Sequence, residues 1–175
     1  MSQNKNIKVF VNILSILRVA MIPVLVIIEP KISVLAFFVI VNLLFITDFF
    51  DGYLARKYDA TSEMGALLDL LGDKLLVAYL MLWALFTGKL GIVIVFLVIL
   101  REILSMVIRF IKNRSEHSNN SIPASFWGKF KTTMQFIAFD MLLLTIPGYQ
   151  IAFIIVLILG YYSLFTYFKV FLGKE

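Results

Sequence analysis

Six apolar stretches restrict the folds that this 175-residue chain can adopt more than any other feature does. A helix that crosses a bilayer needs about 20 mainly apolar residues, a length that each stretch approaches or reaches with its flanking residues. The composition agrees, since 61% of the residues are hydrophobic and 15% are charged, against about 25% charged residues in ordinary soluble domains. The stretches are Val11–Ile28, Ile32–Thr47, Leu75–Phe86, Leu90–Leu100, a fifth between Pro123 and Pro147, and Ile151–Phe168.

This pattern predicts an all-α integral membrane protein with six transmembrane helices. The chain would form a single domain over residues 1–175, beginning with a short cytoplasmic segment at residues 1–10. Six spans leave no room for a separate soluble catalytic domain, so any chemistry must be done on the spans or in the short loops. The absence of cysteine excludes disulfides, thiolate metal sites and a cysteine nucleophile.

The positive residues predict the orientation, because Lys and Arg accumulate on the cytoplasmic side of membrane proteins. A cytoplasmic N-terminus leaves only Lys31 and Lys89 on the outer side. The formal charge of +5 is then mainly a topological signal, with membrane lipids as partners and no nucleic acid. The cytoplasmic set is Lys5, Lys8, Arg56, Lys57, Lys112, Arg114, Lys169 and Lys174.

The charges inside the spans gather in the cytoplasmic half, with Asp140 near mid-span as the exception. Each ionised side chain in the bilayer core costs at least about 2.5 kcal/mol, so such a concentration predicts a shared polar cavity on the cytoplasmic side. The charged residues concerned are Asp48, Asp51, Arg56, Asp69, Asp73, Arg101, Glu102, Arg109, Lys129 and Lys131.

Four of these carboxylates have helical spacing. Asp48 and Asp51 are three residues apart at the end of the second stretch, and Asp69 and Asp73 are four apart before the third. Carboxylates brought together without a counterion would repel, and Mg²⁺ or Mn²⁺ with oxygen ligands is the simplest remedy. A pair of such ions suits phosphoryl chemistry, and Gly52 and Gly65 allow backbone and ligand to approach closely.

The same residues resemble the signature of the CDP-alcohol phosphotransferases. That signature is D-x-x-D-G-x-x-A-R, eight positions, then G-x-x-x-D-x-x-x-D, and residues 48–73 meet every fixed position. Within the family the chain is most similar to the bacterial phosphatidylglycerophosphate synthases, in residues 12–23 and in Gly128-Lys129-Phe130-Lys131-Thr132. It departs from that group at Val11, where Pro is usual, and at Leu70 and Gly72, where D-P-L-A-D is usual.

The resemblance implies transfer of a phosphatidyl group from CDP-diacylglycerol to sn-glycerol 3-phosphate, with release of CMP. Two divalent cations, Mg²⁺ or Mn²⁺, would be held by Asp48, Asp51, Asp69 and Asp73, and Asp73 would also be the general base. CDP-diacylglycerol would be bound by Asp48, Asp51, Gly52, Ala55, Arg56, Gly65 and Asp69. The resemblance also implies a homodimer in the bacterial inner membrane, with its active site facing the cytoplasm.

A phosphorylated acceptor needs a basic pocket. The candidates are Arg101, Arg109, Lys129, Lys131 and, on the first span, Arg18. For these cations the alternative is snorkelling to the headgroups, and for the four aspartates it is an ion-pair network with Arg56, Lys74 and Arg101. Glu102 is expected to pair with a nearby Arg or Lys rather than to bind metal.

Other functions remain open at this point. Cardiolipin synthases and other CDP-diacylglycerol-dependent phosphatidyltransferases, acting on serine or inositol phosphate, share much of the pattern. A divalent-cation transporter could also use intramembrane acids, but the outer halves of the spans offer no polar route across the bilayer.

Overall fold

The computed structural model describes the backbone of residues 2–57, 63–115 and 126–171, and the side chains of residues 13–47, 71–108, 111, 130–166 and 168–169. Within these residues the chain is helical and contains no strand. The elements are α1 (Ser2–Ile28), a 3-10 helix η1 (Glu29–Lys31), α2 (Val34–Lys57), α3 (Glu63–Phe86), α4 (Ile92–Ser115), α5 (Phe126–Leu143) and α6 (Tyr149–Phe171).

The helices confirm the all-α prediction, and each predicted stretch falls mainly within one of them. Among the residues whose side chains are described, two segments are long and apolar enough to cross a membrane by length and composition, Ile13–Lys31 and Tyr149–Thr166, and Val34–Thr47 is a shorter apolar segment. The helices also extend past the apolar residues. Thus α2 runs on through the first half of the acidic motif, and α3 begins before its second half.

Two tight turns end α3 and α5. Gly88 has φ of 69° in the turn before α4, and Gly148 has φ of 90° in the turn before α6. Glycine adopts this left-handed conformation without the steric cost that a Cβ atom imposes. Thr145 adopts it too, with φ of 54°. Backbone hydrogen bonds close both turns.

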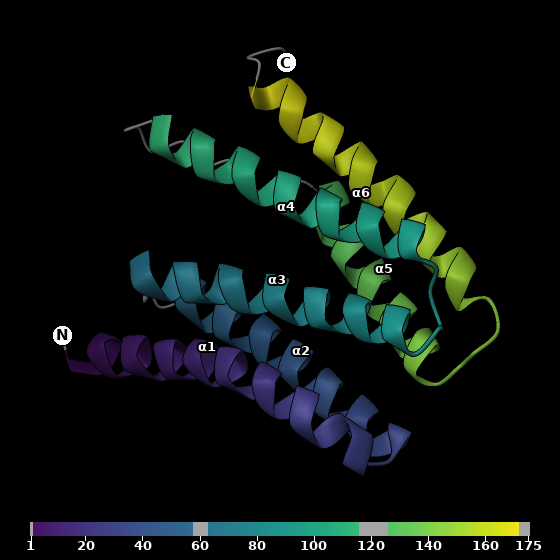
Figure 1. Ribbon diagram of the computed structural model, residues 1–175. Coiled ribbons are helices and arrows are strands. Elements are labelled where there is room, and N and C mark those ends of the chain that lie inside the picture. The colour runs from purple at the N-terminus through teal and green to yellow at the C-terminus, as the bar shows by residue number, and fades with distance from the viewer. Residues whose placement is uncertain (1, 58–62, 116–125, 172–175) are drawn as a thin grey trace. The chain divides into compact units, whose positions relative to one another are not determined.

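The chain divides into two compact units, residues 1–79 and 80–175. In the first unit α1 and α2 pack side by side (Figure 1). Its core includes Leu25, Val41 and Phe37, all 2% exposed or less. The Phe37 ring meets the Tyr79 ring of α3 edge to face at 6.4 Å between centroids, the arrangement that aromatic quadrupoles favour.

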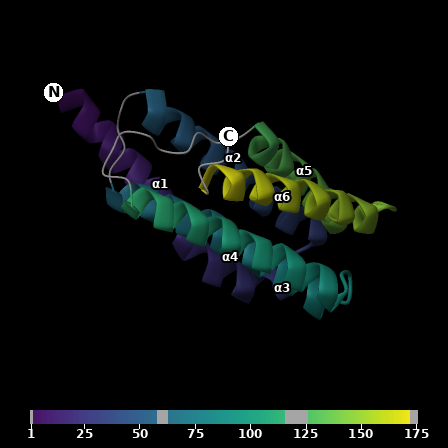
Figure 2. The same cartoon turned by 90° about the horizontal axis from the view of Figure 1, so that it is seen from above.

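In the second unit α6 packs against both α5 and α4, as Figure 1 and the turned view of Figure 2 both show. Phe139 of α5 and Phe153 of α6 are fully buried, with ring centroids 5.4 Å apart. Between α6 and α4 the Tyr161 hydroxyl donates to the Leu97 carbonyl at 3.2 Å. These contacts fix α4, α5 and α6 around one interior.

Large apolar side chains also cover the outside of the helices. Phe86, Ile92 and Ile158 are 84%, 68% and 64% exposed, respectively, and many other Leu, Ile and Val side chains are exposed as well. Soluble proteins rarely expose contiguous apolar surface on this scale. The described helices therefore carry the kind of surface that lipid covers in a membrane protein.

Candidate active site

The two halves of the acidic motif lie on α-helices. Asp48 and Asp51 belong to α2, and Asp69 and Asp73 belong to α3, so the two positions within each half share one face of a helix. The side chains of Asp48, Asp51, Ala55, Arg56 and Asp69, and the surroundings of Gly52 and Gly65, lie outside the described residues. Their metal and nucleotide roles stay predictions.

Asp73 is the motif carboxylate whose side chain the structure describes. Its Oδ2 atom lies 3.0 Å from Lys74 Nζ, and the two side chains are 30% and 22% exposed. Lys74 therefore neutralises charge beside Asp73. This contact is one of the ion pairs in the network that was the alternative to metal binding. An ion pair this exposed is worth little stability, and the Asp73 carboxylate is only partly covered.

Arg18 of α1 lies beside the helix that carries Asp73. Its side chain is buried, at 1% exposure, and its Cδ atom is 3.4 Å from the position that a Cβ atom on Gly72 would take. Since Gly72 has no side chain, the stem of Arg18 can pass against α3 one residue before Asp73. This candidate cation thus belongs to the first unit, next to the acidic helix.

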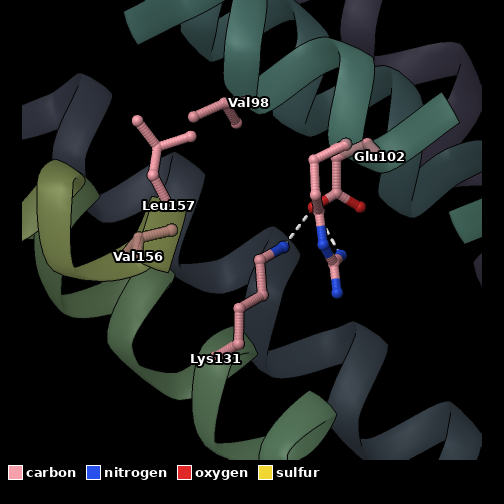
Figure 3. A pocket seen from close by; sticks show the side chains of 6 residues that line it. Val98, Glu102, Lys131, Val156 and Leu157 are labelled. Carbon is pink, nitrogen blue, oxygen red and sulfur yellow. Dashed lines mark hydrogen bonds and ion pairs between the residues drawn. The ribbon is translucent and has the colours of Figure 1, made fainter. Parts of the chain in front are cut away.

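A buried charged cluster lies between α4 and α5 in the second unit. Glu102 Oε1 accepts a hydrogen bond from Arg101 Nη1 at 3.1 Å, and it pairs with Lys131 Nζ. Figure 3 shows the Lys131 side chain extending toward Glu102, with Val98, Val156 and Leu157 nearby. Two acceptor candidates are therefore brought together on one carboxylate oxygen.

The exposures of Arg101 and Lys131 argue against snorkelling of these two side chains. The side chains of Arg101, Glu102 and Lys131 are 7%, 6% and 4% exposed. A snorkelling cation keeps its head in water, whereas these heads are turned inward. The expectation that Glu102 pairs with a nearby Arg or Lys is confirmed. The side chains of Arg109 and Lys129 lie outside the described residues.

The backbone of Gly160 on α6 is a second hydrogen-bond partner of Arg101, besides Glu102. Arg101 Nε donates to the Gly160 carbonyl at 3.1 Å, and a Cβ atom on Gly160 would lie 3.2 Å from Nε. A side chain there would press on the guanidinium. The pocket that Arg101, Glu102 and Lys131 line with Val98, Val156 and Leu157 is filled so closely that no water-sized space remains.

Two further buried polar side chains were not singled out by the sequence. Gln135 and Ser163 are 2% and 0% exposed, and Gln135 Nε2 and Ser163 Oγ have no hydrogen-bond partner among the described residues. Gln135 lies one helical turn after Lys131 on α5, so its spacing was a usable signal. No spacing of this kind identifies Ser163. Nor does any spacing identify Gly160 as the residue whose carbonyl accepts a hydrogen bond from Arg101.

Comparison with known proteins identifies the family. The family model described as CDP-alcohol phosphatidyltransferase matches residues 8–168. A CDP-diacylglycerol--glycerol-3-phosphate 3-phosphatidyltransferase of Haemophilus influenzae is 38% identical, over 97% of this chain and 95% of its own length. One of the same name from Rickettsia bellii is 32% identical over 82% of this chain and 79% of its own.

A probable phosphatidylglycerophosphate synthase of Mycobacterium tuberculosis is 33% identical, over 78% of this chain and 66% of its own length. The matched region contains the whole acidic motif and every acceptor candidate. This chain therefore belongs to the CDP-alcohol phosphatidyltransferase family.

Proposed function

We propose that this protein transfers a phosphatidyl group from CDP-diacylglycerol to sn-glycerol 3-phosphate, giving phosphatidylglycerophosphate and CMP. The observation that carries the proposal is the complete acidic motif, in a chain that aligns over nearly its full length with a relative named for this reaction. The buried Arg101 and Lys131 support it, since both cations reach one anionic oxygen, as binding of a phosphorylated acceptor requires.

The donor set fits a pair of divalent cations. Asp48, Asp51, Asp69 and Asp73 offer only carboxylate oxygens, which Mg²⁺ and Mn²⁺ prefer, and the chain has no cysteine thiolate that would favour a softer metal. When bound, the two ions would neutralise the pyrophosphate and stabilise the attacking and leaving oxygens. Gly52, Ala55, Arg56 and Gly65 would shape the nucleotide site, with Arg56 supplying planar donors to phosphate or base.

Asp73 is the residue to which we assign the proton transfer. Its carboxylate would take the proton of the acceptor hydroxyl as that oxygen bonds to the β-phosphorus and the bond from phosphorus to the CMP oxygen breaks. Its partial exposure fits this role, because a general base must reach its substrate. The other groups act by positioning and by neutralising charge.

The acceptor's phosphate would be bound by Arg101 and Lys131, with Arg109, Lys129 and Arg18 as further candidates. Arg101 and Lys131 have the clearest support, since their burial in the second unit is a cost that membrane helices rarely accept without function. Arg18 is equally buried, but it lies beside α3. It therefore suits the donor phosphates as well as the acceptor.

All six α-helices would cross the membrane, with a cytoplasmic N-terminus and the polar cavity on the cytoplasmic side. Their lengths of 18 to 27 residues support this, because about 20 residues span the hydrocarbon core. The positive residues support the orientation. Diacyl substrate and product would stay in the bacterial inner membrane while acceptor and CMP exchange with the cytoplasm, and the protein would act as a homodimer.

The decisive experiment incubates purified protein with CDP-diacylglycerol, Mg²⁺ or Mn²⁺ and one acceptor at a time, and identifies the lipid product by mass. We expect CMP release and phosphatidylglycerophosphate with glycerol 3-phosphate alone. Product from phosphatidylglycerol instead would make the protein a cardiolipin synthase, and product from serine or inositol phosphate would assign those acceptors. No CMP release with any alcohol would refute enzymatic phosphatidyl transfer and leave cation transport to be tested.

A further inference from the structure

We propose that Glu102 is a positioning residue for the acceptor's phosphate, because its carboxylate holds Lys131 and Arg101 together as one cationic site. This inference rests on the proposed function, since it assumes an acceptor that carries a phosphate. Glu102 would neither bind metal nor touch the reacting atoms. It would act through the two cations.

The first support is geometric. Arg101 Nη1 and Lys131 Nζ contact the same oxygen, Glu102 Oε1, although they come from different helices. Two nitrogens that share one oxygen are close enough for one phosphate group to contact both. Glu102 thus brings a cation of α5 next to a cation of α4. The described residues leave no water-sized space beside them, so a phosphate would have to open this packing to bind both.

The second support is electrostatic. The cluster holds two positive charges and one negative charge, and all three side chains are at most 7% exposed. Without the carboxylate, two like charges would face each other in a dry interior, where such repulsion is strong. With it, the two cations can lie close together in this interior.

The third support is the hydrogen bond between Arg101 and the backbone of Gly160. Its Nε atom donates to the Gly160 carbonyl at 3.1 Å while its Nη1 atom donates to Glu102. The guanidinium is therefore held at two points, and the missing side chain of Gly160 makes room for it. The backbone of Glu102 also accepts a hydrogen bond, because the Ser105 hydroxyl donates to the Glu102 carbonyl at 2.8 Å.

The test is Glu102→Gln, which keeps the shape of the side chain and removes its charge. We expect the KM for glycerol 3-phosphate to rise about tenfold or more, as for loss of one hydrogen bond between charged groups. The inhibition constant of inorganic phosphate, competing with the acceptor, should rise in parallel. The KM for CDP-diacylglycerol should stay unchanged, and Glu102→Asp, which restores the charge, should recover part of the acceptor affinity.

A merely structural role would lower the amount of folded enzyme without moving either acceptor constant. An unchanged KM for glycerol 3-phosphate in folded Glu102→Gln would therefore overturn the proposal. A lowered KM would also overturn it, because that result would mean that Glu102 competes with the phosphate. The wild-type assay comes first, and failure to use glycerol 3-phosphate there would refute the proposed function rather than the role of Glu102.

If Glu102→Gln does not fold, Gly160→Ala tests the same arrangement with every charge retained. The added Cβ would lie 3.2 Å from Arg101 Nε and push the guanidinium away by a few tenths of an ångström. We expect a severalfold rise in the acceptor KM, whereas Gly91→Ala, where a Cβ meets nothing within 4 Å, should match wild type. Equal acceptor KM values for the two variants would overturn the proposal.

Discussion

Lys131 of α5 and Glu102 of α4 form an ion pair in the interior of the second unit, with side chains only 4% and 6% exposed. They are 29 residues apart in the sequence, and each lies on a helix that also exposes large apolar side chains. Removing one partner of a buried pair is costly, because the other charge stays behind without compensation. Substitutions here therefore report on both packing and binding.

Lys131→Ala should raise the KM for glycerol 3-phosphate by about tenfold or more and lower kcat less, because it removes one of two cations proposed to bind the acceptor's phosphate. Steady-state assays at varied acceptor concentration measure both constants. Lys169→Ala is the control, since Lys169 is exposed near the end of α6. An acceptor KM equal to that of the control would show that the phosphate pocket is elsewhere.

Asp51→Asn and Asp69→Asn should each abolish CMP release, because a neutral amide is a far weaker ligand for a divalent cation than a carboxylate. Asp59→Asn is the matched control, an acid in the eight-residue spacer between the two halves of the motif. CMP release from CDP-diacylglycerol measures the effect. Full activity in either motif variant would contradict the metal assignment.

Metal removal gives an independent check on the same centre. Treatment with a chelator should abolish activity, and added Mg²⁺ or Mn²⁺ should restore it, since the ions would carry much of the charge neutralisation at the pyrophosphate. Ca²⁺ prefers more ligands at longer distances and should restore little. Activity that survives exhaustive chelation would contradict the two-cation mechanism.

Substitution of Gly72 should depend on size. In Gly72→Ala the new Cβ would meet Arg18 and Val19 at 3.4 Å, an ordinary contact, so CMP release should stay near wild type. In Gly72→Leu the larger side chain would enter the space that the Arg18 stem fills, and activity should be lost. Equal activity of the two folded variants would show that Arg18 is not held against α3.

Phe139→Ala should destabilise the second unit by about 2 kcal/mol, because it leaves a cavity against Phe153. The cost should be smaller than in a soluble core, since the lipid is itself apolar. Unfolding in detergent measures it. Phe86→Ala, at a position 84% exposed, should change stability little, and a similar loss in both variants would count against the α5–α6 packing.

The helices and the acidic motif could be found in the sequence because both are local signals. Apolar stretches of fixed length and carboxylates three or four positions apart are set by helix geometry alone. The sequence also limited Glu102 to pairing with a basic neighbour, because an unpaired carboxylate is too costly in an apolar interior. It could not choose between Arg101, Arg109, Lys129 and Lys131 as the partner.

Among the described residues, the packing of α4, α5 and α6 supplies the partners of Glu102. It joined Arg101 and Lys131 on one Glu102 oxygen and placed the Gly160 carbonyl under the Arg101 guanidinium. In the first unit, the arrangement of α1 and α3 places the buried Arg18 side chain against Gly72. Such contacts depend on how side chains of separate helices interlock, and no periodicity within one helix carries that information.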